Sequence, residues 1–246
     1  MILQRLASAV RQQNWSQIII EILIVVIGIF LGLQVTDWNE ERINLELEKN
    51  YLTKLHSDTD QLIELASPST LTSKLIGDNL KELSQLLIDN QDDADITKLQ
   101  CNSLAYTHIY VTSIVSLPTL NELLSSGQIL LIHNENIRRL ISEFTLQTEK
   151  TMILLNSLQA DKFDFLREYS DIIKINSLQA GNEENFDKLQ VGCDYQLMLN
   201  NDEFKNRLLG NTARYNAHVN VKVSQLDALQ KLHDELEREL GVSHGE

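Results

Sequence analysis

The chain has 246 residues, 43% of them hydrophobic, which is enough to build a core in one large domain or two small ones. Only 2 prolines and 9 glycines interrupt it, a composition that favours long helices over many short strands. The formal net charge of -14 repels phosphate backbones, so we expect no nucleic acid as a partner.

A long apolar run lies near the start of the chain. From residue 18 to residue 35 its only polar side chains are Glu21 and Gln34. A helix of this length approaches the ~30 Å thickness of the hydrocarbon core of a bilayer. Trp15 and Trp38 would stand about 34 Å apart along such a helix, where interfacial aromatic anchors belong. The run therefore predicts a membrane-spanning helix.

The flanks of this run define the first two segments. The sequence LQVTD at residues 33–37 offers no small-residue cleavage site, so we predict an uncleaved signal anchor. Residues 1–16 would form a short cytoplasmic tail, either an interfacial amphipathic helix or a solvated stub, and residues 17–37 the transmembrane helix. The two flanks of the run carry similar numbers of lysine and arginine residues, so their charge hardly discriminates between the two orientations. We adopt the orientation that places the N-terminus in the cytoplasm and the soluble domain in the periplasm.

One side of this helix carries small and polar residues. At 100° per residue, Glu21, Gly28, Gly32 and Asn39 fall within about 40° of one another, and Gln17 lies beside them. Glycines at this spacing let two backbones approach, and a polar side chain in hydrocarbon gains by finding a partner. We predict that this face binds another transmembrane helix, from a second copy of the chain or from another membrane protein. The alternative is that glycine is simply frequent in membrane helices and that Glu21 reaches back to the interface.

Beyond the membrane the sequence predicts helices throughout. Residues 38–66 keep helical spacing and predict a stalk helix that ends near Pro68, because proline disfavours continuation. Fewer than four clean heptads are present, so packing against later helices is preferred to a coiled coil. Residues 67–246 predict an antiparallel helical bundle. The predicted fold class is therefore all-α, with one N-terminal transmembrane helix that continues into a stalk helix and the bundle.

Local signals mark the first elements of the bundle. A helix ending near Ile88 is followed by DNQDDAD, which lacks the glycine and closing glutamate of a calcium loop, so we predict a solvated turn with Asp95 capping the next helix. Thr119 and Glu122 have the spacing of a capping box. Gly127 stands just after the short helix that this box would begin, at the position where a left-handed backbone conformation commonly ends a helix.

The second half of the bundle has two long helical patterns. One begins after Asn134 as the cap and persists to Ile172, and the other covers residues 202–240. Residues 181–201 read as a linker between them. The β-branched stretch 108–115 is predicted as helix or irregular, since a lone strand has no partner.

No motif for catalysis, cofactor binding or metal binding is present in the sequence. His56 stands near two aspartates at a spacing that splays them around a helix, and His233 lacks the second histidine of a zinc-protease motif. Cys101 and Cys193 are too far apart for a CxxC pattern. They could pair in an oxidising periplasm, closing a loop worth about 4 kcal/mol, or remain buried thiols.

Several segments together resemble a bacterial family of single-anchor membrane proteins known as a domain of unknown function. The likeness spans most of the chain and rests on these segments: Glu21, VVIGI at 25–29, Gln34, WNE at 38–40, LLSSG at 123–127, and residues 132–138. The resemblance implies a bacterial inner membrane. It implies no catalytic residue and no cofactor.

These features favour an assembly or interaction protein without catalytic activity. Its transmembrane helix would bind another such helix, and its acidic soluble bundle would contact other proteins. The alternative is an extracytoplasmic module that senses a small ligand. Because a tail of some 16 residues holds no output domain, such a sensor would need a partner membrane protein, which favours the interaction function.

Overall fold

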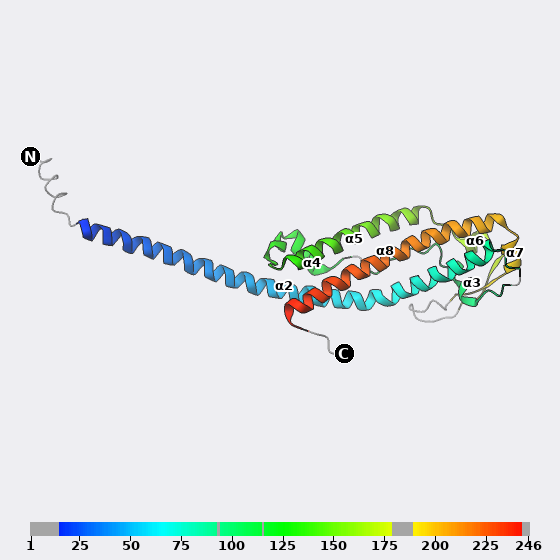
Figure 1. Cartoon of the computed structure of the whole chain (residues 1–246), viewed down its shortest axis with the longest axis horizontal. Coiled ribbons are helices and arrows are strands. Elements are labelled where there is room, and N and C mark those ends of the chain that lie inside the picture. Colours follow the sequence, from blue (N-terminus) through cyan, green and yellow to red (C-terminus); the bar gives the residue numbers. More distant parts are fainter. Residues whose placement is uncertain (1–14, 93, 115, 179–188, 243–246) are drawn as a thin grey trace, which may run out of the picture. The chain divides into compact units, whose positions relative to one another are not determined.

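The computed structural model describes residues 15–92, 94–114, 116–178 and 189–242 (Figure 1). Contacts divide the chain into two compact units, Met1–Asn50 and Tyr51–Glu246, and helix α2 (Trp15–Ile88) contributes to both. The described part is all-α except for one two-stranded hairpin, which confirms the predicted fold class.

Helix α2 passes through Pro68, so the prediction that the stalk helix ends there is wrong. Proline removes the N–H that would bond to the carbonyl of Glu64. Both residues are exposed, so water can satisfy that carbonyl on the solvent side of the helix. The other side is buried at Ala66 and Thr70, and this packing holds the helix together. Tertiary contacts therefore override the local preference.

The second unit contains the remaining helices and the hairpin. In chain order they are α3 (Lys98–Leu104), α4 (Pro118–Ser125), the 3₁₀ helix η1 (Gln128–Leu131), α5 (Glu135–Ala160), α6 (Phe165–Glu168), β1 (Ile173–Leu178), β2 (Leu189–Cys193), α7 (Tyr195–Leu199) and α8 (Asp202–Leu240). Within this unit the long helices α5 and α8 run side by side, and α8 also packs along the part of α2 that follows Asn50 (Figure 1).

Two hydrophobic clusters fill the second unit. One contains Leu52 and Leu55 of α2, the start of α5 and the end of α8. The other contains the last turns of α2, the start of α8 and the hairpin. On α8 the cluster positions Leu229, Leu232 and Leu236 recur at three-and-four spacing and are all fully buried. This is the apolar face that the sequence pattern predicts.

The start of α5 and both ends of α8 are those that the sequence predicts. Asn134 accepts hydrogen bonds from the backbone N–H groups of Asn136 and Ile137, which confirms it as the cap of α5. Helix α8 covers Asp202–Leu240, as predicted, and Gly241 ends it with a left-handed φ of 64°.

Two shorter predictions near helix ends have different outcomes. Thr97, not Asp95, caps α3, and it forms a capping box with Gln100. The side chain of Thr97 accepts from the N–H of Gln100, and the side chain of Gln100 accepts from the N–H of Thr97. Gly127 adopts the predicted left-handed conformation, with a φ of 72°.

Helix α4 starts two residues earlier than predicted and has no capping box. Leu117 occupies the cap position without a side-chain hydrogen bond, and Pro118 is the first helical residue. Thr119 is buried, and its backbone N–H donates to Oδ2 of Asp58 at 2.8 Å. A carboxylate from α2 therefore takes the role that the threonine was expected to play.

The segment between α5 and α8 differs most from prediction. The helix predicted to reach Ile172 ends at Ala160. Strands β1 and β2 pair antiparallel, and only β2 lies in the predicted linker of residues 181–201. Cys101 of α3 and Cys193 of β2 form a disulfide with their Cα atoms 5.9 Å apart. Local periodicity cannot reveal such a hairpin, because its strands are stabilised by contacts with α3 and α6.

Candidate functional site

The first part of α2 is an apolar surface. Each of the following side chains is more than half exposed: Ile20, Ile22, Leu23, Ile24, Val25, Val26, Ile27, Ile29, Phe30, Leu31, Leu33 and Val35. Within the described residues α2 is long and apolar enough to cross a membrane, and none of its most apolar window is buried. The cost of exposing so much apolar surface to water is removed when the helix lies in lipid.

The predicted interaction face lies on this helix. A Cβ atom added at Gly28 or Gly32 would meet no other atom within 4 Å, so this side of the helix is open. Asn39 accepts a hydrogen bond from Arg42 at 3.3 Å, and Trp38 is 66% exposed.

The remaining predicted residues of this region lie outside the described side chains. They are Trp15, Gln17 and Glu21, together with the tail of residues 1–14. Their predicted roles stay predictions.

The surface between α2 and α8 in the second unit contains buried polar groups. Lys222 is only 2% exposed, and its ammonium donates to the carbonyl and Oγ of Ser69 and to Oγ of Ser73. Burial disfavours the charged form and lowers the pKa of Lys222 to about 8. Farther along, Ser84 and Thr212 share a hydrogen bond of 3.0 Å. These contacts fix the register of the two helices.

Polar side chains of α8 also hold the irregular segment 108–114. Gln225 is fully buried, donates to the carbonyl of Ile114 and accepts from Thr112. His218, also fully buried, lies with Nε2 2.8 Å from the carbonyl of Val111. Burial lowers the pKa of His218 to about 4, so its imidazole is neutral at neutral pH.

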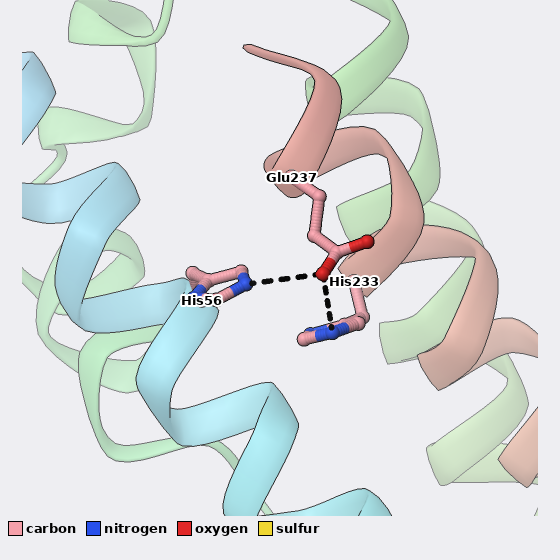
Figure 2. Close-up of side chains that lie close together, drawn as sticks. All are labelled: His56, His233 and Glu237. Carbon is pink, nitrogen blue, oxygen red and sulfur yellow. Dashed lines mark ion pairs between the residues drawn. The ribbon is translucent and has the colours of Figure 1, made fainter. Parts of the chain in front are cut away.

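Three ionisable side chains meet near the end of α8. His56 comes from α2, whereas His233 and Glu237 come from successive turns of α8 (Figure 2). Oε1 of Glu237 lies 4.0 Å from Nε2 of His56 and 3.6 Å from Nε2 of His233. The two imidazole rings stack, with centroids 4.6 Å apart and planes at 18°. The site is largely enclosed: His56, His233 and Glu237 side chains are 14%, 10% and 24% exposed.

A buried hydroxyl defines the tautomer of His233. The single proton of Thr59 is donated to the carbonyl of His56 at 2.8 Å. Oγ1 of Thr59 must therefore accept in its 3.0 Å contact with Nδ1 of His233, which places a proton on Nδ1. In the neutral ring the lone pair is then on Nε2, the atom that faces Glu237.

Local motif inspection missed this cluster because its members lie far apart in the chain. The two aspartates near His56 splay around the helix, and His233 has no second histidine nearby, so neither local pattern predicts a metal site. The usable signal was the spacing from His233 to Glu237, which places both on one face of a helix. Only the packing of α2 on α8 adds His56.

Comparisons with known proteins add no relative. No family model, curated protein or solved structure matches the chain. The resemblance to a bacterial family of single-anchor membrane proteins therefore stays a prediction.

Proposed function

We propose that this protein is a membrane-anchored interaction protein that assembles through its transmembrane helix and its acidic helical domain. The anchor would lie in a bacterial inner membrane, with the N-terminal tail in the cytoplasm and the second unit in the periplasm. The observation that carries the proposal is the continuous run of exposed apolar side chains at the start of α2.

The interaction face would be the side of the helix that carries Gly28 and Gly32. Both positions are open to a close neighbour, since among the described residues a Cβ atom added at either glycine would meet nothing within 4 Å beyond the adjacent turns of the helix. A second helix could approach its backbone there, and Asn39 would extend the polar edge of the contact.

The partner would be a second copy of the chain or another membrane protein. The net charge of the chain, -14, disfavours polyanions, and the resemblance described above implies no enzyme activity. A small-ligand sensor that acts through a partner is the alternative function, and a saturable small ligand bound by a solitary chain would favour it.

Association of the helix in the membrane tests this proposal. We expect Gly28→Ile and Gly32→Ile to weaken association in a membrane reporter assay by at least a few-fold, because each adds bulk to the contact. Phe30→Ile, an exposed position between them in sequence, is the matched control and should associate like the unmodified chain. Equal association of all three variants would contradict the proposed interaction face. Purification of the unmodified chain from mild detergent as a monomer with no partner would contradict the interaction function.

A further inference from the structure

We propose that His56, His233 and Glu237 form a binding site for a zinc-class transition-metal ion that cross-links α2 to α8. The site lies entirely within the second unit. The inference does not depend on the proposed interaction function.

The ligand set suits such an ion. Two imidazole nitrogens and one carboxylate oxygen are the protein ligands of several tetrahedral zinc sites that keep a fourth position open. Calcium and magnesium prefer six or more oxygen ligands, which this cluster does not offer. Imidazole nitrogen also suits cobalt, nickel and copper, so selectivity within the class would depend on availability.

The distances are close to those that coordination needs. The three ligand atoms lie within 4.8 Å of one another. In a tetrahedral site with bonds of about 2.0 Å, neighbouring ligand atoms lie roughly 3.3 Å apart. The observed separations of 3.6 Å and 4.0 Å from the oxygen of Glu237 therefore require only small side-chain movements.

The surroundings of His233 prepare it as a ligand. Because Oγ1 of Thr59 accepts a hydrogen bond from Nδ1–H, Nε2 of the neutral ring presents its lone pair toward Glu237. A hydrogen bond to the second nitrogen of a histidine ligand is the usual way in which proteins orient the ring at a metal. Thr59 is fully buried and bonded to the carbonyl of His56, so it cannot turn away easily.

Binding has a structural consequence at the rings. The lone pairs of two nearly parallel imidazoles cannot point at one ion, so the 18° stack must open. The torsion between Cβ and the ring of histidine is soft, and the ring of His56 can turn toward Glu237 at little cost. The 24% exposure of Glu237 leaves a path for the ion and for a water ligand.

Metal titration of the full chain in detergent, purified with a tag that lacks histidine, tests the site. We expect one Zn²⁺ to bind per chain in calorimetry, and Co²⁺ to give the visible absorption of a tetrahedral site. His56→Asn, His233→Gln and Glu237→Gln should each weaken binding at least 10-fold. Thr59→Val, which keeps the shape of the side chain, should weaken it about 10-fold because it removes only the orienting bond.

The matched control is His108→Gln. His108 is a partly exposed histidine of the same unit that contacts Asp164 at 3.8 Å, away from the cluster. Its removal should leave the affinity for Zn²⁺ unchanged. Free Zn²⁺ at 100 times the dissociation constant should also shift the folding equilibrium of the unmodified chain and of this control by about 100-fold, and should not shift that of His233→Gln.

Two results would overturn the inference. One is the absence of saturable Zn²⁺ binding to the unmodified chain. The other is binding that survives undiminished in both Glu237→Gln and Thr59→Val, variants whose fold circular dichroism can verify, because the ion would then lie elsewhere.

Discussion

Two regions of helix α2 differ in opposite ways from an ordinary surface helix: one exposes apolar side chains and the other buries polar ones. From Ile22 to Val35, α2 carries apolar side chains that are each more than half exposed among the described residues. From Thr59 to Ser84 it carries polar side chains that are buried and hydrogen-bonded to α8. A lipid bilayer can solvate the first region, whereas only α8 can satisfy the second.

The difference shows that hydrophobicity and burial are separate properties here. The apolar region needs an environment outside the chain, and a partner there can be lipid or another helix. In the polar region each buried group gains little net stability from its hydrogen bond but would cost much if left unpaired. In the first region, replacing one apolar side chain by another should have little effect, whereas a charged side chain should prevent membrane insertion. In the second region, both an apolar and a charged substitution of a buried polar side chain should lower the free energy of unfolding.

The largest effect should come from charge in the apolar region. Val26→Arg combined with Ile29→Arg should raise the free energy of membrane insertion by about 6 kcal/mol. We expect the double variant to leave the membrane fraction after cell lysis. Leu65→Arg, at a 63% exposed position of the second unit, should stay in the membrane fraction. Retention of the double variant would mean that the apolar region does not anchor the protein.

Reduction of the disulfide should have the next largest effect. Cys101 and Cys193 are separated by 92 residues, and opening a loop of this size should lower the free energy of unfolding by about 4 kcal/mol. Chemical unfolding of the detergent-solubilised chain with and without reductant measures this. Cys101→Ser should behave like the reduced chain and become insensitive to reductant. A quantitative disulfide in protein isolated from cells would support a periplasmic domain.

Lys222 tests the buried polar region directly. Lys222→Ala removes three hydrogen bonds and leaves a cavity, so it should lower the free energy of unfolding by about 3 kcal/mol. Lys222→Met should cost less, because it fills the space without burying a charge.

The pH dependence of the free energy of unfolding distinguishes the effect of the buried charge of Lys222 from the effect of lost packing. The pKa of Lys222 is about 8 in the folded chain and near 10.5 when unfolded, so the unfolded state binds more protons between these values. The stability contribution from this group should therefore rise with pH from about 8 to 10.5. Lys222→Met should lack that rise, and an identical profile in both proteins would mean that the ammonium is not buried.

His218 should give the smallest effect, with the same sign at lower pH. Its pKa of about 4 lies below the ordinary 6.5, so its contribution is fully present above 6.5 and is lost as pH falls toward 4. At pH 4.5 the loss should be about 2 kcal/mol in urea unfolding. His218→Gln should show a smaller difference between pH 7 and pH 4.5 than the unmodified chain.

The sequence predicts the features that are encoded locally. The apolar run, the cap at Asn134 and the ends of α8 each depend on neighbouring residues and on helical spacing. The passage of α2 through Pro68 and the hairpin β1–β2 depend on contacts between distant segments. A single sequence carries no direct record of those contacts.

The candidate sites divide in the same way. Gly28 and Gly32 can be placed on one face from spacing alone, because both belong to one helix. The cluster of His56 with His233 and Glu237 requires the register of α2 against α8, which buried pairs such as Ser84 with Thr212 determine. The sequence alone therefore does not predict that His56 lies next to His233 and Glu237.

The carboxylate of Asp58 has a consequence for the order of folding. Helix α4 has eight residues, begins with a proline and lacks a cap of its own. Isolated helices below ~12 residues are marginal in water, so this segment gains its first turn only when Asp58 can accept from Thr119. We therefore expect helix α4 to form only after its segment docks on α2, so protease cleavage between Ile114 and Gly127 should report that docking rather than the intrinsic stability of the helix.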